Sequence, residues 1–116
     1  MVSVINITRG SYHKLQFNIG DSQDVSGYTI TFSMDNDPIA VPNPAIMKTS
    51  GSGIDMTDAS TGTIYVELTE ADTRALEVST HTLEYRYDLL FEKDSKPEVW
   101  HKGMAIVENP VYLAPE

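Results

Sequence analysis

The sequence contains no cysteine, few basic residues and no long hydrophobic run. Without cysteine, the chain has neither a disulfide framework nor a thiolate-ligated metal site, and it suits assembly in a reducing cytosol. Its apolar runs span only a few residues, far below the roughly 20 that cross a bilayer, and its N-terminus lacks the basic and apolar regions of a signal peptide. We therefore expect a soluble protein with no membrane partner and no export signal.

Basic side chains number 8 against 17 acidic ones, so the formal net charge is −9. Nucleic-acid phosphates would be repelled, and no Lys/Arg cluster offsets this repulsion locally, so we expect no nucleic-acid partner. The 116 residues are enough for one domain, which we place over residues 1–116. A domain of this size removes roughly two-thirds of its unfolded surface from water.

Alternation of apolar and polar residues is the strongest structural signal in the chain. It predicts strands over residues 15–19, 28–34, 64–68 and 83–91, and weaker strands over 2–8, 45–49, 54–57 and 99–107. Gly103 is a candidate bulge, because the apolar residues around it favour both faces of the last strand. Short strands with turn residues about every ten positions predict an all-β sandwich or barrel.

One segment departs from the alternation, over residues 69–76. Thr69 is a candidate N-cap, acidic residues occupy the first turn, and alanines favour helix. The sequence predicts a short helical turn near residues 70–76, with Leu68, Ala71 and Leu76 closing one end of the fold.

Residues with chemical potential form no recognisable catalytic or metal motif. The histidines are scattered and read as surface residues, and the serines stand in turns without a nucleophile elbow; the histidines are His13, His81 and His101. Four aspartates flank predicted strands, where turn hydrogen bonding is the simplest role and metal binding is the alternative: Asp21, Asp24, Asp55 and Asp58. Paired carboxylates for hydrolysis stay open, because their separation depends on tertiary structure. We expect no enzyme activity and no cofactor.

Aromatic residues and the two termini are the remaining candidates for a binding surface. Most aromatic residues occupy predicted inward positions; Tyr12, Tyr65, Trp100 and Tyr112 do not. Tyrosine and tryptophan are enriched at protein interfaces, and exposed rings on one face would instead favour sugar binding. Both chain ends are apolar, so the interface candidates are Val2, Val4, Tyr12, Trp100, Tyr112 and Leu113.

Several short strings resemble a known family. They are Ile-Thr-Arg-Gly at 7–10, Tyr-Thr-Ile-Thr-Phe-Ser-Met at 28–34, the turn at 57–63, the cap and helix at 68–76 and the Tyr-rich strand at 83–90. Their order resembles the immunoglobulin-like β-sandwich of tail and baseplate proteins of tailed bacteriophages, most closely the N-terminal domain of baseplate upper proteins. The resemblance covers roughly residues 7–108 and implies an antiparallel sandwich of seven or eight strands with one helical turn.

The resemblance implies a non-enzymatic virion structural protein, assembled in the host cytoplasm. Its partners would be other virion structural proteins and further copies of itself. Baseplate upper proteins continue into further domains, whereas this sequence ends at Glu116, so we expect a tail or baseplate component, an adaptor or a capsid decoration protein. A carbohydrate- or ligand-binding module is the alternative, and a small hydrolase with paired acids is a third.

Overall fold

The computed structural model describes residues 3–19, 24–35, 45–76, 82–94 and 96–110, with backbone only for residues 3 and 96–101. These residues form eight strands, a 3₁₀ turn at Ala59–Thr61 and helix α1 at Glu70–Arg74. The strands are β1 (Ser3–Thr8), β2 (His13–Asn18), β3 (Thr29–Asp35), β4 (Ile46–Ser50), β5 (Gly53–Asp55), β6 (Thr63–Leu68), β7 (Thr82–Lys93) and β8 (Lys96–Glu108). The predicted all-β fold is confirmed.

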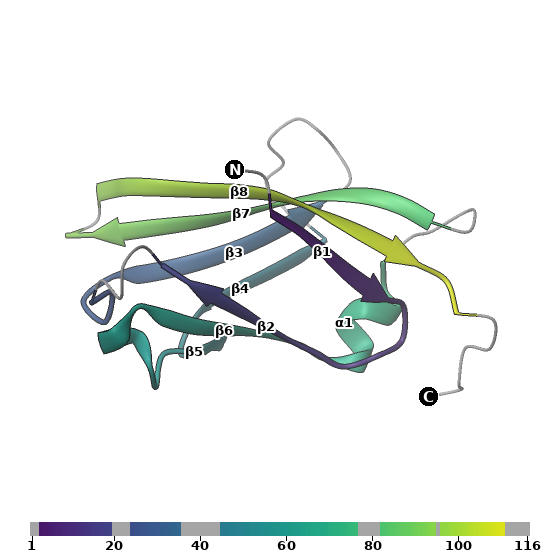
Figure 1. The fold of residues 1–116 in the computed structure, drawn as a ribbon, viewed down its shortest axis with the longest axis horizontal. Helices are drawn as coiled ribbons and strands as arrows, with labels where there is room; N and C mark the ends of the chain where they lie inside the picture. The colour runs from purple at the N-terminus through teal and green to yellow at the C-terminus, as the bar shows by residue number, and fades with distance from the viewer. Residues whose placement is uncertain (1–2, 20–23, 36–44, 77–81, 95, 111–116) are drawn as a thin grey trace.

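The strands are hydrogen-bonded into one sheet in the order β1-β8-β7-β3-β4-β5-β6-β2. The sheet curves so that β2 and β6 face β7 and β8 across the core (Figure 1). β1 pairs with β8 in parallel, as β4 does with β5, while the other pairs are antiparallel. The expectation of a wholly antiparallel sheet is therefore wrong. No hairpin joins β1 to β8, so no turn dictates their relative direction.

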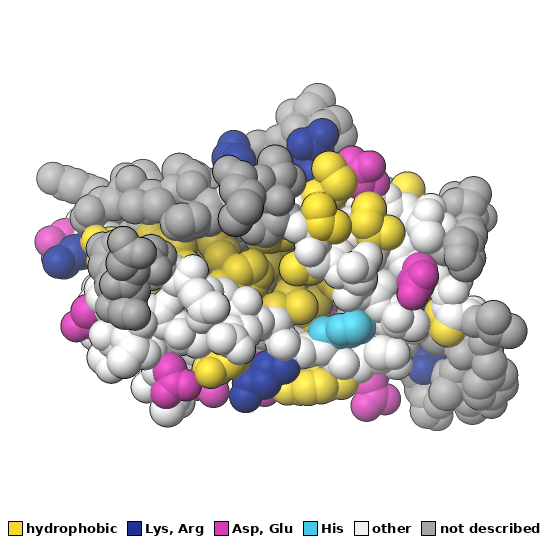
Figure 2. Space-filling view, in the orientation of Figure 1, with side chains coloured by type: hydrophobic (Ala, Val, Ile, Leu, Met, Phe, Trp, Pro, Cys, Tyr) yellow, Lys and Arg dark blue, Asp and Glu magenta, His cyan; other side chains and the backbone are white. Residues whose placement is uncertain are grey.

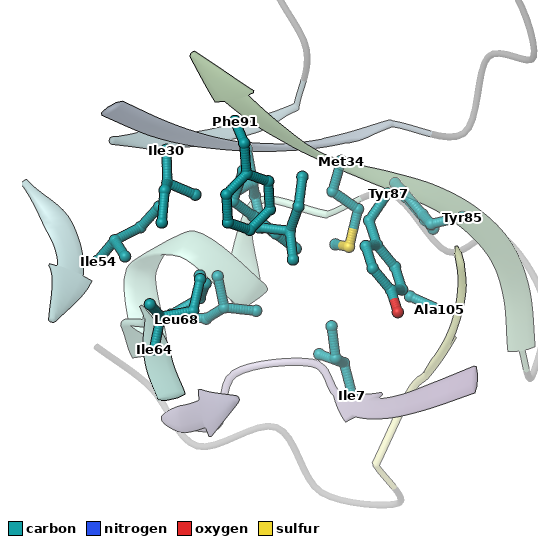
Figure 3. Packing of buried hydrophobic residues seen from close by; sticks show 14 of the residues in the cluster. Ile7, Ile30, Met34, Ile54, Ile64, Leu68, Tyr85, Tyr87, Phe91 and Ala105 are labelled. Carbon is teal, nitrogen blue, oxygen red and sulfur yellow. The ribbon is translucent and has the colours of Figure 1, made fainter. Parts of the chain in front are cut away.

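Inward positions of the alternating strands build the core (Figure 3). Along β3, the even-numbered residues are buried and the odd-numbered ones are not, as period-two geometry requires. Three rings from different strands meet in the core: Phe17 lies 6.2 Å from Phe32 and 5.7 Å from Tyr87, centroid to centroid. These aromatic contacts connect β2 to the β3–β7 part of the sheet.

β8 keeps its pairing with β7 through Gly103, and the register shift comes instead between Phe91 and Glu92 of β7. The predicted bulge at Gly103 is therefore wrong. Glycine is needed there for another reason, because a Cβ at Gly103 would collide with the Tyr87 ring. After Gly103 the phase of β8 is regular, since Ala105 and Val107 are both fully buried.

Helix α1 confirms the predicted helical turn. Thr69 and Asp72 form a reciprocal capping box, with the Thr69 amide donating to Asp72 Oδ2 and the Asp72 amide donating to Thr69 Oγ1. Leu68 and Leu76 are buried as expected, but Ala71 is exposed and Thr73 takes the buried position. The buried side of the helix therefore includes the polar hydroxyl of Thr73.

Candidate protein-interaction surface

The turn between β1 and β2 is attached to α1 by hydrogen bonds. Arg9 Nε donates to the carbonyls of Arg74 at 3.2 Å and Leu76 at 2.7 Å, and Arg9 Nη1 donates to Asn109 Oδ1 at 3.1 Å. These bonds satisfy carbonyls at the end of the helix that lack intrahelical partners. The sequence indicated Arg9 only as part of the Ile-Thr-Arg-Gly string at residues 7–10.

Thr73 completes this attachment from inside the helix. Its hydroxyl accepts a hydrogen bond from the Gly10 amide at 3.0 Å and donates to the Ser11 carbonyl at 2.8 Å. Gly10 has a φ of 84°, a conformation that glycine adopts without steric cost. We call the region built from Arg9, Gly10, Ser11 and Thr73 the α1 anchor.

Beyond the α1 anchor, β1 and β2 diverge as the two edges of the curved sheet. We call the strip between these two strands the seam. Near the anchor, the Thr8 amide donates to His13 Nε2 at 3.1 Å, but no ladder joins β1 to β2 among the described residues. Figure 2 shows hydrophobic side chains at the surface between β1 and β2. The seam is thus a place where the core reaches solvent.

Side chains of β2 are less buried than their register partners on β6, and this difference reflects the seam. Leu15 of β2 is the register partner of Val66 of β6, and Phe17 is the partner of Ile64. Val66 and Ile64 are fully buried, whereas Leu15 and Phe17 are only partly buried although they pack on the core. Among the strands that the structure describes, β6 has a neighbour on each side, and β2 has one on one side only.

The direction of the backbone groups on β2 follows from one bond at its end. The Ile19 amide donates to the Gly62 carbonyl on the β6 side. Because successive residues of a strand point their N–H and C=O groups to opposite edges, those of Leu15 and Phe17 also face β6. The backbone groups of Lys14, Gln16 and Asn18 therefore face the seam.

A small apolar patch lies on the outer face of β1 and β8, where Figure 2 shows hydrophobic side chains gathered over β8 beside β1. Val4 is 55% exposed and lies beside its register partner, the partly exposed Met104. Ile106, also partly exposed, is the next outward residue of β8. We call Val4, Met104 and Ile106 the β1–β8 patch. The interface prediction for Val4 thus falls on an exposed side chain.

The outer face of β2 and β6 carries two tyrosines, both engaged in polar contacts. Tyr12 is 51% exposed, and its hydroxyl donates to Glu67 Oε1 at 2.7 Å, which raises the pKa of Tyr12. The Tyr65 hydroxyl donates to Asp58 Oδ2 at 3.1 Å, which likewise raises the pKa of Tyr65. Lys14 Nζ lies 4.7 Å from the Tyr65 ring centroid and so occupies one face of the ring.

The aspartates that sequence analysis left open as metal ligands have local roles where they are described. Asp24 and Asp55 accept hydrogen bonds from the residue two positions on, and the side-chain bonds from Ser26 and Thr57 lower the pKa of each carboxyl. Over the described ranges, no three His, Cys, Asp or Glu side chains gather as a metal site would require.

The other interface candidates are placed only in part. The backbone of Trp100 lies in β8 opposite Leu90, and its side chain is outside the described part. Val2, Tyr112 and Leu113 lie outside the described residues, as do His81 and Asp21. In the portion that is described, no helix has the length and hydrophobicity to cross a bilayer.

Comparison with known proteins finds no matching family model and no matching curated sequence. The resemblance to phage tail and baseplate domains stays a prediction from the residues themselves.

Proposed function

We propose that this chain is a non-enzymatic structural protein of a tailed-bacteriophage virion, a tail, baseplate or adaptor component with an immunoglobulin-like β-sandwich domain. It acts through contacts with other virion proteins and with copies of itself. The virion role is proposed because the short sequence strings from Ile7 onward occur in an order that resembles phage tail and baseplate domains. An all-β chain that wraps a single core between facing parts of its sheet is compatible with a sandwich.

The observation that carries an assembly role is the β1–β8 patch. Val4 projects from an edge strand that contains no charged residue, in a protein of net charge −9. Exposed apolar groups that gather on one strand pair mark interaction sites more often than scattered ones do. In a repeated assembly, even a small patch contributes, because many copies make the same contact.

The test compares two exposed hydrophobic residues on different strands. Val4 on β1 is 55% exposed and Met47 on β4 is 57% exposed, so Val4→Asp and Met47→Asp introduce the same charge at nearly equal exposure. Each variant is placed in the phage that encodes the chain, and tryptic peptides of the chain are quantified in purified particles. We expect normal incorporation of Met47→Asp and strong loss of Val4→Asp, with equal thermal unfolding of both purified proteins.

Two results would contradict the proposal. One is a chain that is abundant in the lysate but absent from purified particles. The other is equal incorporation of the two variants, which would remove the β1–β8 patch as an assembly surface. Separation of heads from tails before the measurement distinguishes a tail or baseplate component from a capsid decoration protein.

Carbohydrate binding is the second candidate, since Tyr12 and Tyr65 lie on the same outer face of β2 and β6. The contact between Lys14 and the Tyr65 ring weakens this candidate, because a sugar stacking there would have to displace the ammonium. A glycan array probed with the purified protein and with Tyr12→Ala tests it. Binding that disappears in the variant would support a sugar site, and an array without hits would remove it.

A further inference from the structure

Apart from Lys14, β2 lacks the features that usually protect an edge strand. Natural edges carry proline, bulges or inward-pointing charges that prevent pairing with another chain. β2 has the sequence His-Lys-Leu-Gln-Phe-Asn, with no proline, and it pairs with β6 without a register shift. Its half-buried inward positions after His13 are Leu15 and Phe17, both apolar.

The facing edge of β8 is protected by comparison. β1 pairs with residues 103–108 of β8, so an edge of residues 96–102 extends past β1. That stretch contains Pro97 and lies opposite the register shift at Phe91 and Glu92. Proline cannot donate to a ladder, and a bulge disrupts it. Of the two edges along the open part of the seam, β2 is the one able to accept a full strand.

The chemistry of the seam distinguishes it from the rest of the surface. β1 and β2 contain no acidic residue, although the chain has 17, and β2 carries Lys14. The Lys14 ammonium contacts the Tyr65 ring. The hydrogen bonds from Thr57 are the main cause of the lowered pKa of Asp55, and the charge of Lys14 is the smallest contribution to it. The nearest acidic residues, Glu67 opposite Lys14 and Asp55, lie on β6 and β5, on the far side of β2 from its free edge. An acidic segment added at that edge would therefore lie nearer to Lys14 than to these carboxylates, which favours it there.

We propose that β2 accepts an extended segment of another polypeptide as an additional edge strand in the seam, and that this segment alternates apolar with acidic residues. The inference deepens the proposed function and rests on it for the identity of the partner. The recognition mode is strand addition to a sheet edge.

Each part of such a segment has a counterpart on β2. Its backbone pairs with the free N–H and C=O groups of Lys14, Gln16 and Asn18. Its apolar side chains cover Leu15 and Phe17, which then gain the second neighbour that Val66 and Ile64 already have. Its acidic side chains fall on the outer face beside Lys14, where an opposite-charge cross-strand pair is favourable.

Gln16 offers a matched pair of variants. Gln16→Pro removes the free amide that faces the seam without removing a β2–β6 bond, whereas Gln16→Ala keeps that amide. Both variants lose the side-chain bond from Gln16 Nε2 to Asn18 Oδ1, so this loss is common to the two. The probe is a soluble synthetic peptide of about eight residues that alternates Val with Glu or Asp, and its control alternates Val with Lys or Arg.

The measurement is a titration of each peptide into the full-length protein labelled with ¹⁵N. We expect the acidic peptide to shift and protect from exchange the amides of Lys14, Gln16 and Asn18. We expect at least about tenfold weaker binding to Gln16→Pro, with Gln16→Ala close to the unmodified chain. Shifts confined to another strand, equal binding to Gln16→Pro, or equal binding of the basic peptide would each overturn the proposal. A homodimer that forms with the unmodified chain and is lost in Gln16→Pro would also overturn it, since the strand added to β2 would then come from a second copy.

These outcomes are separable from those of the proposed function. A chain that is absent from virions but still binds the acidic peptide at β2 leaves the strand-acceptor edge standing with a partner elsewhere. A chain incorporated into virions whose β2 amides ignore the peptide refutes the edge and leaves the virion role intact.

Discussion

The two ends of the seam differ in how the same pair of strands is held. At the α1 anchor, hydrogen bonds of Arg9 and Thr73 connect the β1–β2 turn to the helix. Along the open part, β6 is the one neighbour of β2 among the described strands, and Leu15 and Phe17 remain partly exposed. The anchor thus provides stability to the fold, while the open part leaves backbone groups and apolar surface for a partner.

The largest expected difference within this comparison is between two leucines of neighbouring strands. Leu68 on β6 is fully buried, and Leu15 on β2 is only partly buried. We expect Leu68→Ala to lower the free energy of unfolding by about 2–5 kcal/mol. Leu15→Ala should cost about half as much, because part of its surface is already in water. Urea unfolding of both variants measures this, and equal losses would mean that the seam is closed in solution.

Removal of the Arg9 side-chain bonds is expected to have the next largest effect. Arg9→Met keeps much of the aliphatic length but loses the bonds to Arg74, Leu76 and Asn109. We expect a loss of about 2–3 kcal/mol, because bonds from a charged donor are stronger than neutral ones. Lys14→Met on β2 is the matched control and should cost below about 1 kcal/mol. If Lys14→Met lowered the free energy of unfolding as much as Arg9→Met does, polar contacts in the open part would stabilise the fold as strongly as those of the anchor.

The Thr73 hydroxyl makes a further contribution to the stability of the anchor, and a single substitution measures it. Thr73→Val keeps the shape of the side chain but leaves the Gly10 amide and the Ser11 carbonyl without that partner. We expect a loss of about 1–3 kcal/mol in thermal or urea unfolding, since unsatisfied buried groups retain their desolvation cost. Thr73→Ser restores the hydroxyl and should recover much of the loss. An unfolding free energy for Thr73→Val equal to that of the unmodified chain would refute this role.

The smallest expected effect is a pH dependence at the capping box. Burial raises the pKa of Asp72, but hydrogen bonds from Lys48 and Thr69 outweigh it, so the pKa lies below its ordinary value. The stabilisation is therefore present above the unfolded pKa near 3.9 and is lost as pH falls through the lower folded value. Stability measured between about pH 5 and 2 should fall less steeply in Asp72→Asn than in the unmodified chain. Identical slopes would contradict the assignment.

The local structure was predictable where one stretch of sequence decides it. Alternation placed β3, β6 and β7 within a residue or two of their observed bounds, and the Thr69 cap placed α1. The bulge was misplaced at Gly103, because a glycine in a strand indicates either a bulge or a close neighbour, and the neighbour here is Tyr87 from another strand. Arg9 and Thr73 escaped notice for a similar reason, since their partners are more than 60 residues away.

The interface candidates show the same division. The sequence could identify Val4 as apolar near a chain end, but not that Met104 and Ile106 lie next to it on the outer face. Tyr12 was a candidate for an interface or a sugar-binding surface, and only the fold brings Glu67 to its hydroxyl. No pattern in β2 distinguished it from an interior strand, because edge position depends on which strands pair.

The sequence by itself determined the approximate strand positions, the core-facing side of the clearly alternating strands, the capped helix and the excess of acidic residues, because each follows from residues near one another in the chain or from composition. Only the tertiary structure decided that β1 lies parallel to β8, that Arg9 fastens the turn to α1 and that β2 is left as an open edge. The physical reason is that the backbone hydrogen-bonding groups are the same in every residue except proline. Which strands pair is therefore decided by the packing of the whole core and not by local sequence.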